Sequence, residues 1–269
     1  MKATKSETRI VGIVLARNED RFIERAVANA TAFCDHWIFA DHGSSDQTPV
    51  IMEKWAGNLP SAEIHRISKA SESHALLQRY VGEDVWIFGL DGDEVYDPRG
   101  LARLRQRILS GEFDANWMIL GHALHVTQIS DDYRWASGHA SPPCRSMTKL
   151  YNFAAISAWE GYCPERLHGG NLVFRGAYGN DQRAMLHETG PWEESDFRCL
   201  HLCFLSRSSR DNNSGPRANL MEIQGATQLS LWASRVGRWL GWRPGSRWKD
   251  ERYRRGELQK VEALEFFDN

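Results

Sequence analysis

Two aspartates one residue apart, Asp91 and Asp93, follow the apolar run "DVWIFGL". At the end of a strand, two carboxylates at this spacing can point the same way and hold one hard divalent cation. Such a cation also binds phosphate oxygens and neutralises a diphosphate leaving group. A solvated acidic turn after a buried strand has the same pattern. The spacing therefore predicts a Mn²⁺ or Mg²⁺ site at Asp91 and Asp93, with the acidic turn as the alternative.

Two further polar turns, "LARNED" and "ADHGSSDQT", suit a nucleotide. The Asp41 carboxylate can accept a hydrogen bond from a nucleobase imide or a ribose hydroxyl, and Gly43 permits a tight turn that brings backbone close to a ligand. Helix capping is the competing role for Asn18 and for residues 44–46. The predicted nucleotide-sugar-binding residues are Ala16, Arg17, Asn18, Glu19, Asp41, Gly43, Asp91 and Gly92.

The elements that position these turns alternate along the chain. Helical patterns around residues 22–33 and 48–55 separate short apolar runs, which indicates a mostly parallel sheet with helices on both faces. Ligands bind such sheets where loops leave the carboxyl ends of the strands. Because the polar turns stand at those ends, we expect them to meet in one crevice. The predicted strands are 9–16, 36–41, 62–68 and 84–90.

The second half of the chain has a less regular pattern. Pro98 opens a predicted helix that a glycine closes, and residues 115–126 form a predicted strand. Residues 127–143 contain "SDDYRWASGHASPP", which predicts a long loop that covers the substrate. "SRDNNSGPR" is typical of a hinge.

These patterns predict two regions. Residues 1–207 form a catalytic domain, with a nucleotide-binding half at about 9–110 and an acceptor half at about 111–207. Residues 208–269 form the hinge and a basic, Trp-rich, helical C-terminal extension. The amphipathic extension suits an anionic membrane surface, or it packs its tryptophans on the catalytic domain.

Charge and composition exclude several classes. With 33 Lys+Arg against 35 Asp+Glu, the net charge of −2 excludes a global polyanion-binding protein, so no nucleic-acid partner is expected. No apolar run is long enough to span a bilayer, and the start lacks the apolar core of a secretory signal, which predicts a cytoplasmic protein. An odd set of five cysteines predicts reduced thiols.

Together, "IVLARNEDRFIERAV", "FADHGSSDQT" and "LDGDE" resemble the family 2 glycosyltransferases with the Rossmann-like GT-A fold, over roughly residues 9 to 205. The resemblance implies inverting transfer of a sugar from a nucleotide-diphosphate donor, with the metal held by Asp93 and assisted by Asp91. Relatives often have Asp-Asp-Gly-Ser in the nucleoside turn, whereas this chain has Asp41, His42, Gly43 and Ser44.

Two more segments are similar to parts of that family. "KLYNFAAISAWEGYCPERL" implies Glu165 as the base, a role that suits a carboxylate near an acceptor hydroxyl. Relatives commonly carry histidine where Cys163 stands. A salt bridge is the competing role for Glu165, and rival bases are Asp181, Glu193 and Glu194.

The segment "CLHLCFLSRS" resembles the region where relatives place a histidine that completes the metal shell, and His201 matches it. A buried, hydrogen-bonded histidine is the alternative. On a strand, Cys199, His201 and Cys203 would share one face, which also makes a zinc-type site conceivable.

The resemblance implies a donor with UDP as first candidate and GDP or dTDP as alternatives, and a glycan, lipid-linked or small-molecule acceptor. It suggests cell-envelope polysaccharide, lipopolysaccharide or other glycoconjugate synthesis, with the extension touching the inner face of the membrane. One alternative is a haloacid-dehalogenase-like phosphatase with Asp91 as nucleophile and Asp93 as acid/base. Another is a non-catalytic nucleotide-sugar-binding module.

Overall fold

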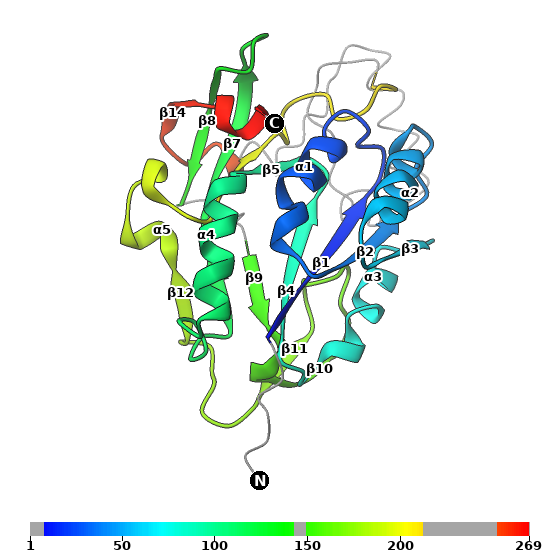
Figure 1. The fold of residues 1–269 in the computed structure, drawn as a ribbon, viewed down its shortest axis with the longest axis vertical. Helices are drawn as coiled ribbons and strands as arrows, with labels where there is room; N and C mark the ends of the chain where they lie inside the picture. Colours follow the sequence, from blue (N-terminus) through cyan, green and yellow to red (C-terminus); the bar gives the residue numbers. More distant parts are fainter. Residues whose placement is uncertain (1–7, 143–148, 212–251, 269) are drawn as a thin grey trace.

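The computed structural model describes residues 8–142, 149–211 and 252–268, and a seven-stranded sheet lies at its centre (Figure 1). Four strands of this sheet are mutually parallel, in the spatial order β4-β1-β2-β3, and β9 joins antiparallel to β4. The mixed, mostly parallel sheet is therefore confirmed. The strands are β1 (Arg9–Ala16), β2 (His36–Asp41), β3 (Ala62–Arg66), β4 (Val85–Asp91), β6 (Met118–Leu120), β9 (Lys149–Asn152) and β12 (Arg183–Met185).

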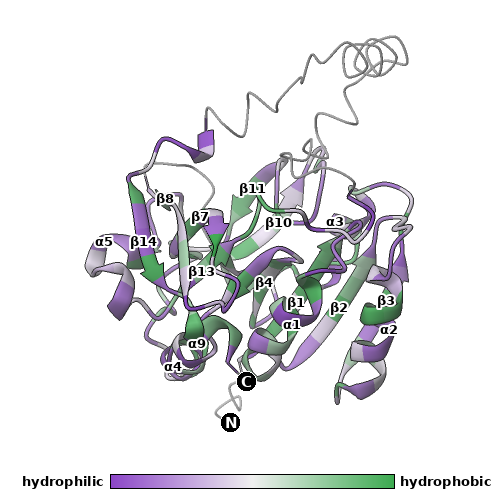
Figure 2. Cartoon of the chain, turned by 90° about the horizontal axis from the view of Figure 1, so that it is seen from above, coloured by the Kyte–Doolittle hydropathy of each residue, from purple (hydrophilic) through white to green (hydrophobic). Residues whose placement is uncertain are grey.

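Both faces of this sheet are covered. Seen from above, α1 (Ile23–Ala30), α2 (Thr48–Asn58) and α4 (Pro98–Leu109) lie on one side. On the other side lie α3 (Glu72–Ala75) and a hairpin (Figure 2). Since side chains alternate along a strand, β1 places Ile10, Val14 and Ala16 in an apolar cluster on one face, and Val11 and Ile13 in another on the opposite face. This explains its unbroken apolar sequence. The hairpin consists of β10 (Ile156–Glu160) and β11 (Asn171–Phe174).

A second, five-stranded sheet follows the order β14-β8-β7-β13-β5. Its strand β13 pairs antiparallel with β5, which directly follows the acidic pair, so His201 lies opposite Glu94. The second sheet therefore carries the later half of the chain back to the acidic turn. Its strands are β5 (Glu94–Tyr96), β7 (His122–Ile129), β8 (Trp135–Ser141), β13 (Arg198–His201) and β14 (Leu258–Glu262).

The long loop predicted at residues 127–143 is wrong. β7 continues to Ile129, and β8 returns antiparallel beside it. The strand is hard to recognise because its residues are small and polar. At Gly138, a Cβ would lie only 2.2 Å from the carbonyl oxygen of His125, so the close pairing requires glycine. The single strand predicted at 115–126 is also two, β6 and β7, which belong to different sheets.

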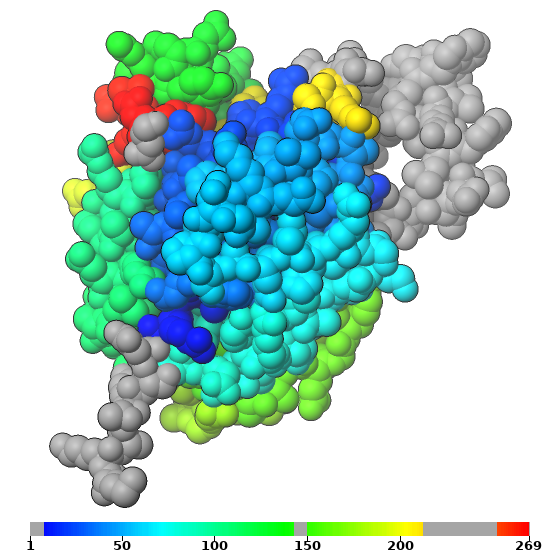
Figure 3. Space-filling view, turned by 45° about the vertical axis from the view of Figure 1, so that its right-hand side comes forward, coloured from blue at the N-terminus to red at the C-terminus, as the bar shows by residue number. Residues whose placement is uncertain are grey.

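The end of the chain differs from the predicted helical extension. Residues 258–262 form β14, an edge strand on β8. Within the described range 252–268, helix occurs at residues 252–253 and in α9 (Leu264–Phe267), with Phe266 buried in the core of the second sheet. Figure 3 shows this red segment against the green β7–β8 hairpin. The Trp-rich stretch expected to contact a membrane lies outside the described residues. Within the described ranges, every helix is too short or too polar to cross a bilayer. The four described cysteines are free thiols.

Arg198 ties the end of the chain to the start of α4. Its guanidinium donates to Asp97 Oδ2 at 3.0 Å and to Glu265 Oε1 at 2.6 Å, and both Arg198 and Asp97 are buried. Removing one partner of a buried ion pair leaves the other charge uncompensated. We expect Arg198→Met to lower the free energy of unfolding by about 3–5 kcal/mol, measured by urea denaturation.

The matched control for this prediction is Arg103→Met. Arg103 pairs with Asp196 at 2.6 Å, but its side chain is 53% exposed. Exposed ion pairs contribute less than about 1 kcal/mol. Equal losses of stability in the two variants would contradict the role given to Arg198.

Candidate active site

The three polar turns lie side by side at one edge of the central sheet. In the parallel register of β1 with its neighbours, Ala16 is opposite Asp41 and Leu15 is opposite Asp91. The strands that carry the turns thus end together, as parallel strands of this kind do at a ligand crevice. The expected convergence of the turns is confirmed.

The first two turns hold each other through Asn18. Its backbone N–H donates to Ser44 Oγ at 3.0 Å, and its side-chain Oδ1 accepts from the backbone N–H of Ser45 at 2.6 Å. Asn18 has a positive φ of 54°, a conformation that asparagine tolerates better than most residues. Because α1 begins at Ile23, Asn18 clamps the loop and does not cap that helix.

Asp41 lies buried within the second turn. Its Oδ1 accepts from the backbone N–H of Ser44 at 3.0 Å, and its Oδ2 from Arg66 Nε at 3.4 Å. An ionised carboxylate offers about four acceptor positions, so these two contacts do not use all of them. The neighbouring His42 ring lies 3.2 Å from the carbonyl oxygen of Ser68, and burial lowers its pKa. Gly43 has the positive φ of 63° that the turn requires.

Each carboxylate of the acidic pair is bound by an arginine from the second half of the chain. Arg166 is buried, and the Arg207 side chain is 13% exposed. Arg166 Nη2 forms an ion pair with Asp91 Oδ1. Arg207 Nη1 lies 2.7 Å from Asp93 Oδ2 and 3.1 Å from Glu19 Oε1. The structure therefore unites the predicted residues Glu19, Asp91 and Asp93, and adds two arginines that lie within the two later family-like segments but were not predicted as site residues.

A fourth carboxyl group, Glu94, completes this acidic cluster. Burial, followed by the charges of Asp91 and Asp93, raises the pKa of Glu94 to about 8. The hydroxyl of Tyr96 donates to Glu94 Oε2 at 3.1 Å. Such crowding of carboxyl groups is typical of a site suited to a positive ion.

His201 joins the acidic cluster from the second sheet, with its Nε2 3.8 Å from Asp93 Oδ2. Two carboxylates and an imidazole form a donor set that suits Mn²⁺ or Mg²⁺. Asp91 is the accessible member, since its side chain is 40% exposed, whereas Asp93 is buried. The residues at this edge therefore fit a divalent cation.

The residues beside His201 differ from the predicted set of Cys199, His201 and Cys203. Cys199 lies opposite Tyr96 in the second sheet. His125 instead joins His201 and Cys203, and one potential ligand atom from each lies within 4.8 Å of the others. All three side chains are buried. The sequence missed His125 because it stands 76 residues before His201.

Glu165 lies in the loop between β10 and β11. Its Oε1 is 3.2 Å from His168 Nδ1. Burial opposes the shift, but the charge of Asp91 and, after it, that of Glu165 raise the pKa of Arg166. Arg166 in turn donates to the carbonyl oxygen of Leu90 at 3.2 Å. Gly89 makes this approach possible, since a Cβ there would lie 3.2 Å from Arg166 Nε. The loop thus brings Glu165 beside the acidic cluster.

The rival bases lie elsewhere. Asp181 precedes β12, which runs in the same direction as β4, so it lies at the edge where β4 begins rather than where Asp91 ends it. Glu193 and Glu194 are exposed on a single 3₁₀ turn after α5 (Leu186–Thr189).

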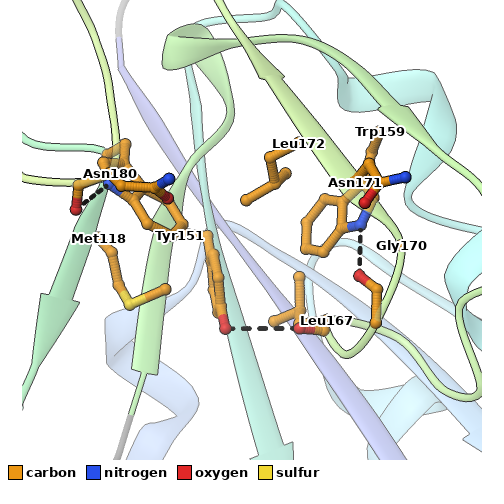
Figure 4. Close-up of a pocket in the computed structure, with 10 residues that line it drawn as sticks. Met118, Tyr151, Trp159, Leu167, Gly170, Asn171, Leu172 and Asn180 are labelled. Atoms are coloured by element: carbon orange, nitrogen blue, oxygen red, sulfur yellow. Dashed lines mark hydrogen bonds between the residues drawn. The ribbon is translucent and has the colours of Figure 1, made fainter.

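A cavity of about 350 Å³ is lined in part by Leu167, Gly169 and Gly170, which lie in the same loop as Glu165 (Figure 4). Its buried wall contains aromatic rings, among them Tyr151 and Trp159, and the exposed Asn171 and Asn180 line it as well. Tyr151 donates to the carbonyl oxygen of Leu167 at 3.4 Å, and Leu167 directly follows Arg166. The cavity and the acidic cluster therefore share one loop.

Comparisons with known proteins place this geometry in context. Among solved structures, S. aureus TarS 1–349 is 18% identical, with a TM-score of 0.38 over 55% of this chain and 48% of that one. A mannosyltransferase from Pyrobaculum calidifontis, in complex with GDP-Man and Mn²⁺, is 16% identical, with a TM-score of 0.38 over 55% and 45%.

A third structure, glucosyl-3-phosphoglycerate synthase from Mycobacterium tuberculosis with Mn²⁺, UDP-glucose and phosphoglyceric acid, is 14% identical, with a TM-score of 0.36 over 55% and 58%. The aligned region thus spans about half the length of these structures. No curated protein matched. The model of the family described as "Glycosyl transferase family 2" matches residues 13–179, more than half of the sequence. The chain therefore belongs to glycosyl transferase family 2.

Proposed function

We propose that the protein transfers a sugar with inversion from a nucleoside-diphosphate sugar to an acceptor hydroxyl, with Mn²⁺ or Mg²⁺ held by Asp91, Asp93 and His201. The observation that carries this proposal is the junction of the two sheets, where the His201 imidazole faces the acidic pair beside the end of β1. A bound cation would neutralise the charge of the diphosphate leaving group.

The donor half of the proposal uses the first two turns. The nucleobase and ribose lie between residues 16–19 and Asp41, with Gly43 and Gly92 allowing backbone to approach. The Asn18 clamp supports this placement because it fixes the two turns relative to each other. Arg17 lies beside the base. UDP is the first donor nucleotide to test, followed by GDP and dTDP.

The acceptor half uses the Glu165 loop. Glu165 accepts the proton of the acceptor hydroxyl as that oxygen attacks the anomeric carbon from the face opposite the diphosphate. The acceptor is a glycan, a lipid-linked sugar or a small molecule of cell-envelope polysaccharide, lipopolysaccharide or other glycoconjugate synthesis. The nearby cavity supports a sugar acceptor, since aromatic rings with a few amide groups are typical of small-molecule sites. Cytoplasmic location and membrane contact through the tail stay predictions.

A thermal-shift experiment tests the donor assignment. The protein is heated with UDP, GDP or dTDP, each with and without Mn²⁺, because ligands that bind only the folded state raise its apparent stability. We expect one nucleotide to raise Tm, and Mn²⁺ to enlarge that shift. No shift with any nucleotide, together with no hydrolysis of the matching sugar nucleotides, would contradict the proposal. The phosphatase alternative is not supported, because the chain matches the glycosyltransferase family.

Asp41→Ala is expected to weaken binding of the donor nucleotide roughly 10- to 100-fold, since a hydrogen bond to a charged group contributes about 1.5–3 kcal/mol. The contact is made equally in the ground and transition states, so the donor KM should rise while kcat changes little. Calorimetric titration with the nucleotide measures the loss.

Two variants control for this substitution. Asp41→Asn keeps an oxygen for the backbone N–H of Ser44, so the turn stays intact. Glu63→Gln on the adjacent strand β3 alters an ion pair with Arg79 and should leave nucleotide affinity unchanged. Native affinity in Asp41→Ala would remove Asp41 from the donor site.

A further inference from the structure

The two imidazole rings of His125 and His201 face each other through the same atom type. His125 Nδ1 lies 2.9 Å from His201 Nδ1, and both residues are buried. Parallel pairing of β7 with β13 places the two residues directly opposite each other. The contact is thus built into the sheet register.

A hydrogen bond between two Nδ1 atoms has only two forms for neutral rings. One ring carries the proton on Nδ1, and the other offers a lone pair there. If His201 donates, its Nε2 keeps a lone pair. If His201 accepts, its Nε2 carries the hydrogen. The partner ring therefore decides what His201 presents on its other side.

The other side of His201 faces the acidic cluster, with Nε2 3.8 Å from Asp93 Oδ2. A histidine that binds a metal through Nε2 needs its lone pair there and donates the Nδ1–H to a neighbour. We propose that His125 is a positioning residue that accepts this hydrogen bond, and so fixes both the tautomer and the ring orientation in which His201 can bind the cation. This inference rests on the proposed function.

Tyr253 holds the accepting ring in place. Its ring stacks on His125 with centroids 4.5 Å apart and planes 8° apart, and it contacts His201 edge-on at 5.4 Å. Because the Tyr253 and His201 rings both pack against it, the His125 ring has a restricted orientation. The side chains that determine the cation site therefore extend from Asp93 through His201 to His125.

The test is a Mn²⁺ titration in which the electron paramagnetic resonance signal of free Mn²⁺ reports binding, without any turnover. We expect His125→Leu to raise the Kd for Mn²⁺ about 10- to 100-fold, the usual effect of losing the partner of a metal-binding histidine. His125→Gln should stay near the wild-type value, because its amide oxygen can accept from His201 Nδ1–H.

The matched control is His122→Leu. His122 is on the same strand β7, but its ring lies 3.2 Å from the carbonyl oxygen of Gly190 and packs on Trp192. We expect Mn²⁺ affinity to be unchanged in this variant. Circular dichroism and Tm establish that each variant is folded before titration.

The remaining outcomes separate this inference from the proposed function. If His201→Leu weakens Mn²⁺ binding but His125→Leu does not, the role of His125 is overturned and the ligand assignment stands. If His201→Leu also leaves Mn²⁺ binding unchanged, both the role of His125 and the assignment of His201 as a metal ligand fail. Equal losses of Mn²⁺ affinity in His125→Leu and His125→Gln would show that His125 acts through packing, and would overturn the inference. So would stoichiometric zinc that disappears in Cys203→Ser, since His125 would then be a ligand itself.

Discussion

Replacing Asp93 with asparagine is expected to lower kcat roughly 10³-fold, which corresponds to about 4 kcal/mol of lost transition-state stabilisation. Asp93 is buried and its Oδ2 lies 3.8 Å from His201 Nε2, whereas the Asp91 side chain is accessible. Asparagine keeps the shape and an acceptor oxygen for Arg207 but removes the charge that attracts a divalent cation. The measurement is steady-state transfer or donor hydrolysis at fixed, moderate Mn²⁺.

The metal dependence of this variant gives the sharper readout. If the charge acts through the cation, raising the Mn²⁺ concentration should restore part of the rate in Asp93→Asn. The wild-type rate should not change. Asp35→Asn is the control. Asp35 precedes β2, at the edge of the sheet opposite the site, and accepts from Ile10 N–H and Arg105. Transfer at the native rate in Asp93→Asn, with an unchanged Mn²⁺ requirement, would show that Asp93 does not hold the metal.

The sequence predicts the central sheet well because its strands are buried on both faces. The runs at β1, β2 and β4 are almost wholly apolar, and a polar turn follows each of them. In a parallel sheet these turns must meet at one edge, so the donor turns and the acidic pair can be placed together before any coordinates are known.

The second sheet is not predictable in the same way. The sequence of β8 is "WASGHAS". Its small and polar residues hide the alternation of apolar and polar side chains that indicates a strand. Its pairing with β14 joins residues more than a hundred positions apart, and β14 itself is only half apolar. Register between strands so distant in sequence depends on tertiary contacts that local periodicity does not contain.

The charge partners of the site were missed for a related reason. Arg166 and Arg207 reach the aspartates from loops 75 and 114 residues downstream. An arginine in a loop gives no sequence signal that separates a buried ion pair from a solvated side chain. Glu94 stood within the acidic motif, but its raised pKa depends on burial and on the two neighbouring carboxylates.

Replacing Glu165 with glutamine is expected to lower kcat about 10²- to 10⁴-fold, the range over which a general base contributes. Glutamine preserves the size of the side chain and an acceptor for His168, which lies 3.2 Å from the carboxylate. The proton of the acceptor hydroxyl then has no carboxylate to receive it. Because Glu165 lies in the loop between β10 and β11 and not in the first two polar turns, the affinity for the donor nucleotide should stay near the wild-type value.

The rival carboxylates turn this experiment into a choice among bases. Asp181→Asn and Glu193→Gln should transfer sugar at close to the native rate, because Asp181 lies at the opposite edge of the sheet and Glu193 is exposed on a turn after α5. A loss confined to Glu165→Gln, with nucleotide binding intact, assigns the base. A large loss of kcat in Asp181→Asn or Glu193→Gln instead would place the acceptor beside that side chain. Glu165 would then act only as the charged partner of His168 and Arg166.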